Sequence, residues 1–263
     1  MVEISSQNEE FLVELARGDS SISGLLATIN PETFANGFYT LRMTACDITG
    51  RSIYIEKQIE ISTLNKATSF QTSETDFVVE NDSVSLNVTR VYDSLNQTIS
   101  TGFGKGWRWA ERDFMIETSS ETINQKSLGI YQPLTYGTRL YLTTPEGDRI
   151  GFTFVPKSID AGNNLVYYTP AWVSDLGTYQ LESVDAILTQ VGTKYYELAT
   201  GLPYNPASGY FDGTAYVLTD IEGRQFELDG TGKTTGIRQP DGKYLLFTEN
   251  AVLCDGNVLI QFV

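Results

Sequence analysis

An acidic residue followed by glycine recurs along the second half of this 263-residue chain, and this repetition limits the fold more than any other feature. The pairs are Glu146-Gly147, Asp212-Gly213, Glu222-Gly223, Asp229-Gly230, Asp241-Gly242 and Asp255-Gly256. From Asp212 onward they stand 10, 7, 12 and 14 residues apart, with aromatic and β-branched residues between them. Such pairs favour the backbone angles of hairpin turns, so this spacing predicts one short hairpin after another.

The same segments form a degenerate repeat. Residues 141–152, 216–226 and 238–244 each place an acidic-glycine turn next to aromatic strand segments. Repeats of this length favour a stacked β array over a closed domain. Helical periodicity is nearly absent: residues 8–16 fit a short helix or a strand over 11–16, and we favour the strand because strands dominate downstream. The predicted fold class is all-β.

The first 62 residues predict a separate β module. Residues 37–45 and 53–61 alternate apolar and polar side chains around a turn at 47–50, which predicts a hairpin. The predicted core face carries Tyr39, Leu41, Met43 and Ala45. Because a complete sandwich needs about 100 residues, we expect this module either to lack its first strands or to lean on the region after it.

The chain is expected to divide into three parts. Residues 1–62 form the first β module, residues 63–75 a polar Ser/Thr-rich linker, and residues 76–263 a second β region. In the second region, Thr89–Leu95 runs from a strand into a turn, and Gly102–Trp109 follows it. Glycines at 102, 104 and 106 leave one face of this segment bare, so another backbone can approach it. The alternation of a strand places Trp107 and Trp109 on one face.

These two segments resemble the start of the shell of RHS/YD-repeat proteins, in which an Arg-x-Tyr-Asp-Ser element precedes a Phe-Gly-x-Gly-Trp element. The segment from Asn36 to Gly50 is similar to the closing strands of the Ig-like or fibronectin-type modules often placed before such shells. The resemblance implies part of an Ig/fibronectin-like β-sandwich followed by a meandering antiparallel β array that begins a shell.

The resemblance also implies structural roles for a set of signature residues. They are Arg90, Tyr92, Asp93, Gly104, Gly106 and Trp107. Arg90 and Asp93 are expected to make turn and inter-strand polar contacts. Gly104, Gly106 and Trp107 are expected to set a tight strand crossing, with Trp107 largely buried.

The resemblance implies a function without catalysis. Proteins of this family form large secreted or surface β-structures, several of which enclose a toxin. The chain is therefore expected to be a structural segment of a shell that encloses or displays a C-terminal toxin or effector, with the rest of its own polypeptide as partner. Family members that cleave themselves use Asp-Pro motifs, and this chain contains no Asp-Pro. The alternative is an extracellular adhesin or carbohydrate-binding module with exposed aromatic residues.

The composition removes most catalytic chemistry. Without histidine there is no Ser-His-Asp or Cys-His nucleophile system and no histidine-ligated metal. Cys46 and Cys254 cannot form a four-thiolate site, and we expect two unpaired thiols. The segment Gly232–Thr235 lacks the earlier glycine of a phosphate-binding loop, because position 227 is Glu, so a hairpin turn is expected there. No calcium loop is present, and nothing selects a carboxylate pair for glycoside cleavage. We expect no enzyme, cofactor or metal.

Charge and hydropathy point away from nucleic acid and membrane. Acidic residues outnumber basic ones 33 to 18, giving a net charge of −15 that repels nucleic acid and anionic lipid. No apolar run approaches the roughly 20 residues that span a bilayer, and Met1–Ile4 do not begin a signal peptide. The resemblance implies a secreted or cell-surface protein, which would be exported by another route or have had its leader removed.

The last strand is expected to be an open sheet edge. Asn257–Val263 carries no charge and no proline, the usual protections of an edge. We expect an unpaired edge near residues 252–263 that pairs with another copy or folds back. Val263 is therefore expected to lie short of the natural end of the protein.

Overall fold

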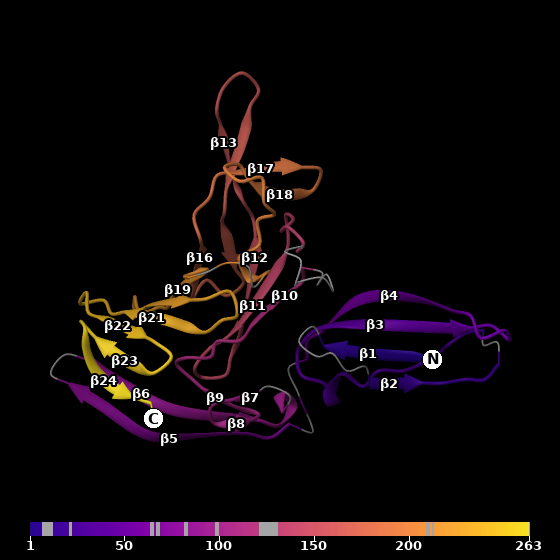
Figure 1. The fold of residues 1–263 in the computed structure, drawn as a ribbon, viewed down its shortest axis with the longest axis horizontal. Coiled ribbons are helices and arrows are strands. Elements are labelled where there is room, and N and C mark those ends of the chain that lie inside the picture. Colours follow the sequence, from indigo (N-terminus) through magenta and orange to yellow (C-terminus); the bar gives the residue numbers. More distant parts are fainter. Residues whose placement is uncertain are drawn as a thin grey trace. The chain divides into compact units, whose positions relative to one another are not determined.

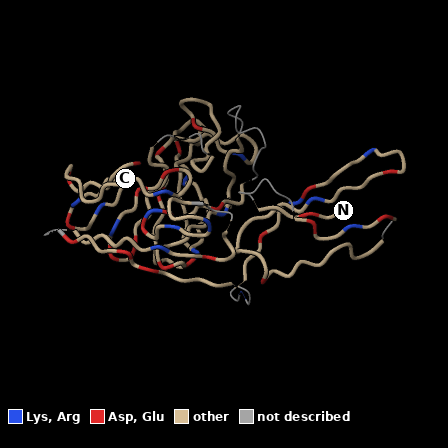
Figure 2. Tube along the Cα trace, turned by 60° about the horizontal axis from the view of Figure 1, so that its bottom comes forward, with Lys and Arg blue, Asp and Glu red and all other residues tan. Residues whose placement is uncertain are grey.

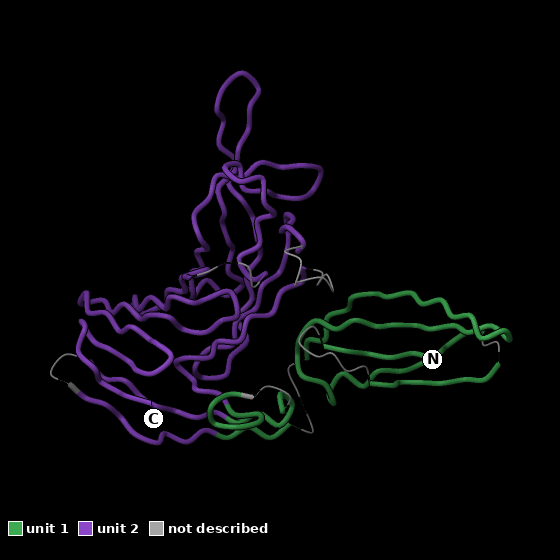
Figure 3. Tube along the Cα trace, in the orientation of Figure 1, with its two compact units in different colours: residues 1–72, 92–107 green, residues 73–91, 108–263 purple. Residues whose placement is uncertain are grey.

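A computed structural model describes residues 1–6, 13–20, 23–63, 66, 69–81, 84–97, 100–120, 131–208, 211 and 213–262. Over these residues the elements are strands, apart from three single-turn 3₁₀ helices, η1 (Pro31–Thr33), η2 (Ser94–Asn96) and η4 (Pro206–Ser208). The predicted all-β class is confirmed. The chain divides into two compact units (Figure 3). The first is Met1–Thr72 with Tyr92–Trp107, and the second is Ser73–Val91 with Arg108–Val263.

The first unit contains a four-stranded antiparallel sheet in the order β2-β1-β3-β4 (Figure 1). Its strands are β1 (Val2–Ser6), β2 (Val13–Ala16), β3 (Gly37–Cys46) and β4 (Ser52–Ile61). The predicted hairpin is confirmed, since β3 and β4 pair from Gly37↔Ile61 to Cys46↔Ser52. β2 confirms the strand expected over 11–16, of which residues 11 and 12 lie outside the described residues.

The described part of residues 1–62 forms one sheet, so the part of an Ig/fibronectin-like β-sandwich expected here is not confirmed. The apolar face of this sheet buries Ile4, Tyr39 and Ile61 beneath the segment that carries Ile29 and Phe34. The predicted core face was wrong at its far end, where Met43 is 40% exposed and Ala45 is also exposed. Alternation puts these side chains on the apolar face, but the covering segment reaches only the end near Tyr39.

Part of the expected linker is strand. Within residues 63–75, strand β5 (Gln71–Asn81) begins at Gln71. β5 belongs to a three-stranded sheet, β5-β6-β9, with β6 (Val84–Asp93) and β9 (Trp107–Trp109). Polar Ser and Thr side chains suit the half-exposed surface of such a strand, so their abundance did not mark a loop.

Three larger sheets make up most of the second unit. The first, β10-β11-β12-β15, contains β10 (Ile116–Thr118), β11 (Arg139–Thr143), β12 (Arg149–Phe154) and β15 (Trp172–Ser174). The second, β13-β14-β17-β18, contains β13 (Lys157–Asp160), β14 (Val166–Thr169), β17 (Leu188–Val191) and β18 (Lys194–Glu197). The third is a seven-stranded sheet that contains β16 (Gln180–Ser183), β19 (Tyr216–Thr219), β20 (Gln225–Leu228), β21 (Thr234–Arg238), β22 (Tyr244–Phe247), β23 (Ala251–Cys254) and β24 (Asn257–Gln261).

The seven-stranded sheet is a meander. Its order, β16-β19-β20-β21-β22-β23-β24, follows the chain, and all its pairs are antiparallel. One face packs against β6, which contributes Val84, Leu86 and Val88 on alternate positions to the main core. Figure 1 shows β5 and β6 lying along the yellow strands of this sheet. A second core cluster, centred on Phe154 and Tyr195, lies under β12, β17 and β18.

Five hairpin turns of both units share one five-residue structure. They span 47–51, 144–148, 220–224, 229–233 and 239–243. In each, the first residue donates its N–H to the carbonyl of the fifth, and the glycine at the fourth position donates to the carbonyl of the first. That glycine has φ between +82° and +96°, a left-handed conformation that favours glycine. The predicted succession of hairpins is therefore confirmed.

In three of these turns, the acidic residue that binds the turn backbone is the first of the five residues. The Asp47, Asp220 and Asp229 carboxylates each accept the backbone N–H groups of the third and fifth residues, at 2.8–3.0 Å. The prediction of an Asp229-Gly230 turn was wrong in detail, because the left-handed glycine is Gly232. The hairpin turn expected at Gly232–Thr235 lies slightly earlier, over 229–233, and Thr234 and Thr235 already belong to β21. At Asp255-Gly256, both residues are left-handed, which forms a two-residue turn between β23 and β24.

Candidate functional site

The signature residues gather where β6 ends and β9 begins. The Tyr92 ring packs against Phe70 and Trp107, with ring centroids 6.2 and 5.3 Å apart. The Asp93 N–H donates to the carbonyl of Gly106 at 2.9 Å, which joins the two segments. Gly106 has φ +75°, and a Cβ there would lie 2.8 Å from Cε2 of Tyr92. Gly106 therefore allows the close approach that its sequence position predicts.

Asp93 ends β6 as a helix cap. Its Oδ1 accepts the N–H of Leu95 at 2.9 Å, and its Oδ2 accepts the Asn96 amide at 2.7 Å, so the side chain fixes the start of η2. Gln71 of β5 also donates to Oδ2, at 3.2 Å. One carboxylate thus makes both the turn contact and the inter-strand contact expected of it.

Arg90 joins β6 to β5. Its Nε and Nη2 donate to the two carboxylate oxygens of Asp76 at 2.6 and 2.8 Å, a bidentate pair across the two strands. Both side chains are about one-third exposed. The contact fixes strand register more than it adds stability, since exposed ion pairs are worth little.

Two expectations for the glycine-rich segment were wrong. A Cβ added at Gly102 or Gly104 would meet no atom within 4 Å, and Gly104 (φ +106°) lies in the small hairpin of β7 (Ser100–Thr101) and β8 (Gly104–Lys105). These glycines serve a turn, not a strand crossing. Trp107 is only partly buried, whereas Trp109 is 2% exposed among Phe247 and Phe262.

Between the two tryptophans lies a buried cation that the sequence analysis missed. Arg108 is 6% exposed and donates to the carbonyl of Thr144 at 2.9 Å, with longer contacts to the carbonyls of Ala110 and Asp113. Carbonyl oxygens replace the water that a buried guanidinium loses. Because side chains alternate along a strand, Arg108 points to the face opposite that of Trp107 and Trp109. This alternation is the feature of the sequence from which a separate environment for Arg108 could have been predicted.

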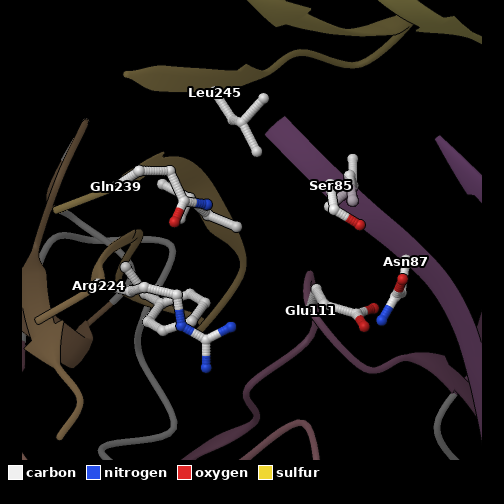
Figure 4. A pocket seen from close by; sticks show the side chains of 9 residues that line it. Ser85, Asn87, Glu111, Arg224, Gln239 and Leu245 are labelled. Atoms are coloured by element: carbon white, nitrogen blue, oxygen red, sulfur yellow. The ribbon is translucent and has the colours of Figure 1, made fainter. Parts of the chain in front are cut away.

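A small polar pocket opens in the second unit, close to this segment (Figure 4). Its floor is formed by the apolar side chains of Leu86, Phe226, Ile237 and Leu245. Its polar lining is formed by Ser85, Asn87, Glu111, Arg224 and Gln239. Figure 4 shows Glu111 beside Asn87, with Arg224 and Gln239 across the opening. The cavity has a volume of about 70 Å³.

Glu111 is the unusual group in this pocket. Its Oε2 atom is buried and accepts no hydrogen bond from any described residue. Burial raises the pKa of its carboxyl, although backbone N–H groups of Glu111 and Thr89, the Trp109 indole and the Arg108 charge oppose this. Arg224, on the opposite wall, is paired with Asp220 at 2.7 Å and lies 3.5 Å from Glu222. The pocket therefore combines a carboxylate of which one oxygen, Oε2, lacks a donor with a cation that is already neutralised.

The described residues include possible metal ligands and two thiols. Among the described ranges, no three His, Cys, Asp or Glu side chains are grouped so as to hold a metal ion. Cys46 is exposed and Cys254 is buried, and both are free thiols, as expected. Acidic residues are spread along both units (Figure 2). No helix in the described part of the chain is long and apolar enough to cross a membrane.

The chain was compared with known protein families, with curated proteins and with solved structures. None of the three comparisons gave a match.

Proposed function

We propose that this chain is a non-catalytic wall segment of a secreted or surface RHS/YD-repeat protein, part of a β-shell that encloses or displays a C-terminal toxin or effector. The observation that carries the proposal is the seven-stranded meander, in which every strand from β19 to β24 pairs with the next along the chain. A sheet that grows strand by strand along the chain can be extended by further hairpins without rearranging those already formed.

The end of this sheet supports the proposal. Of the strands that the structure describes, β24 is the last in its sheet and pairs only with β23. Its sequence has no charge or proline, although such residues normally protect an edge strand. An edge of this kind is suited to receive another strand. In the proposed protein, that strand comes from the rest of the same polypeptide.

The signature region contributes connections and no chemistry. Tyr92, Asp93 and Gly106 join β6 to β9, and Arg90 joins β6 to β5. Their side chains are occupied by hydrogen bonds, ion pairs and ring contacts within the chain. The tryptophans do not form an exposed platform for sugars, since Trp109 is buried and Trp107 and Trp172 are partly buried against other rings.

Sedimentation of residues 1–263 at several concentrations tests the open edge. We expect the chain to self-associate as its concentration rises, and Val258→Lys, which puts a charge on β24, to abolish this. Leu246→Lys is the matched control, because it adds the same charge at an exposed position of β22, inside the sheet. Equal effects of the two variants, or a strict monomer at all concentrations, would contradict an edge ready for pairing.

A further inference from the structure

The pocket beside Glu111 contains polar groups that make no hydrogen bond within the described part of the protein. Among the described residues, no hydrogen bond involves the side chains of Ser85, Asn87 or Gln239, and Oε2 of Glu111 accepts none. A buried acceptor without a donor costs about 1–3 kcal/mol, more when it is charged. These groups are therefore free to contact a ligand that donates hydrogen bonds.

The charge of the pocket also favours a donor ligand. Arg224 is neutralised by Asp220, while Arg108 lies outside the lining, donates to backbone carbonyls and acts on Glu111 only through its charge. Among the described residues, no cation of the lining forms an ion pair with the Glu111 carboxylate. The net charge of −15 adds a general attraction for cations.

The size and floor of the pocket limit the ligand further. A volume of 70 Å³ holds about five water molecules, at about 10–15 Å³ each. A sugar ring or a nucleotide is too large for it. Phe226, Ile237 and Leu245 offer apolar contact for a short hydrocarbon chain.

We propose that this pocket binds a primary alkylammonium group, with Glu111 as its counterion. An ammonium has three donors, and Oε2 of Glu111 together with the side-chain oxygens of Ser85 and Asn87 supplies acceptors for them. The alkyl chain lies on the apolar floor. The group belongs either to a free small amine or to a lysine side chain of another polypeptide segment. This inference does not depend on the proposed shell function.

Titration with butylammonium, followed by amide NMR shifts or calorimetry, tests the site. We expect saturable binding, with shifts confined to residues 85–87, 111 and 237–245. Neutral 1-butanol is expected not to bind. Glu111→Gln, which keeps the shape of the side chain, is expected to weaken binding about 10- to 100-fold, as for loss of a charge-assisted hydrogen bond. Glu249→Gln, at an exposed position that does not line the pocket, is the matched control and is expected to change nothing.

The pH gives a second readout. Burial favours the protonated form of Glu111, and this carboxyl must lose its proton before it can pair with an ammonium group. The affinity for the ammonium is therefore expected to rise with pH until Glu111 is fully ionised. The inference is overturned if wild type shows no saturable shift, or if Glu111→Gln binds within twofold of wild type. Titration with Nα-acetyl-lysine methylamide shows which molecule carries the ammonium group. If it binds as tightly as butylammonium, the group is a lysine side chain; if it binds more weakly, the group belongs to a free amine.

Discussion

The phenol ring of Tyr244 lies over the backbone of Gly236 on the outer face of the seven-stranded sheet. A Cβ at Gly236 would come within 2.6 Å of Cζ of Tyr244. The Tyr244 hydroxyl donates to Glu227 at 2.6 Å, which holds the ring in place. At Gly151 of β12 the space of a Cβ is taken instead by the Asp175 carboxylate and the Arg139 guanidinium, with the Tyr141 ring next to them. At Gly236 an aromatic ring covers a strand glycine, which otherwise leaves the sheet surface unpacked.

Gly236→Ala is expected to destabilise the protein by about 1–3 kcal/mol, the usual cost of forcing an extra carbon into a packed site. Urea unfolding measures this loss. In a Tyr244→Ala background the same substitution is expected to cost much less, because the obstructing ring is gone. An equal cost in both backgrounds would show that the ring does not limit position 236.

Tyr244 is expected to ionise late. Burial and the hydrogen bond to Glu227 raise its pKa to about 12. The folded state therefore favours the neutral phenol, and the stability it contributes is present below pH 10 and lost as pH rises through about 12. Glu227→Gln is expected to lower this pKa, measured by phenolate absorbance against a Tyr244→Phe blank. An unchanged titration would mean that Glu227 does not hold the proton.

The two tryptophans of β9 are expected to differ in their contribution. Trp109→Ala should cost about 3–5 kcal/mol of unfolding free energy, the range for a fully buried large aromatic residue. Trp107→Ala should cost about 1–3 kcal/mol, because that ring is only partly buried against Tyr92. Denaturant unfolding of both variants ranks them. The reverse order would place the main packing at the signature tryptophan.

Asp220 tests the five-residue turn. Its carboxylate is almost fully buried and accepts the N–H groups of Glu222 and Arg224. Asp220→Ala leaves these donors unpaired and is expected to cost about 1.5–3 kcal/mol. Asp220→Asn keeps an acceptor oxygen and is expected to cost less. Asp241→Ala, at an exposed third position of another turn, is the control. Equal losses at Asp220 and Asp241 would argue against the capping role.

Glu111 is expected to make stability depend on pH. Its pKa is raised in the folded state, so the native protein binds this proton more tightly than the unfolded chain. That stabilisation is complete below the ordinary glutamate pKa and is lost as pH rises through the raised value. Glu111→Gln is therefore expected to be more stable than wild type at about pH 8 and to lose the advantage near pH 4. Urea unfolding of both proteins at the two pH values measures this. A difference in unfolding free energy that does not change with pH would contradict the effect of burial on Glu111.

The hairpins could be predicted because turn chemistry is local. An Asp three residues before a glycine brings its carboxylate to two nearby N–H groups, whatever lies around it. The acidic-glycine pairs at 146, 222 and 241 marked the turns at 144–148, 220–224 and 239–243, whereas residue 212 of the pair Asp212-Gly213 lies outside the described residues. Asp229 shows the limit of the pattern. The capping Asp and the left-handed glycine stand three residues apart, so the glycine that forms this turn is Gly232 and not Gly230, which directly follows Asp229.

The sequence could not predict which parts of a sheet face are covered by segments that are distant along the chain. Alternation assigns Tyr39 and Met43 to the same face, but does not show that the covering segment stops before Met43. The pocket is another case, because Ser85, Glu111 and Gln239 come from three distant segments joined only by packing. Nothing in the residues next to Glu111 distinguishes it from the many surface acids of this chain.

Electron microscopy of the natural gene product that contains this chain tests the central claim most directly. The account predicts that another segment of the same polypeptide pairs with β24 as an antiparallel strand, and that the sheet forms part of a wall around an enclosed space. A free β24 edge facing solvent, in a protein that encloses nothing, would contradict the proposed shell.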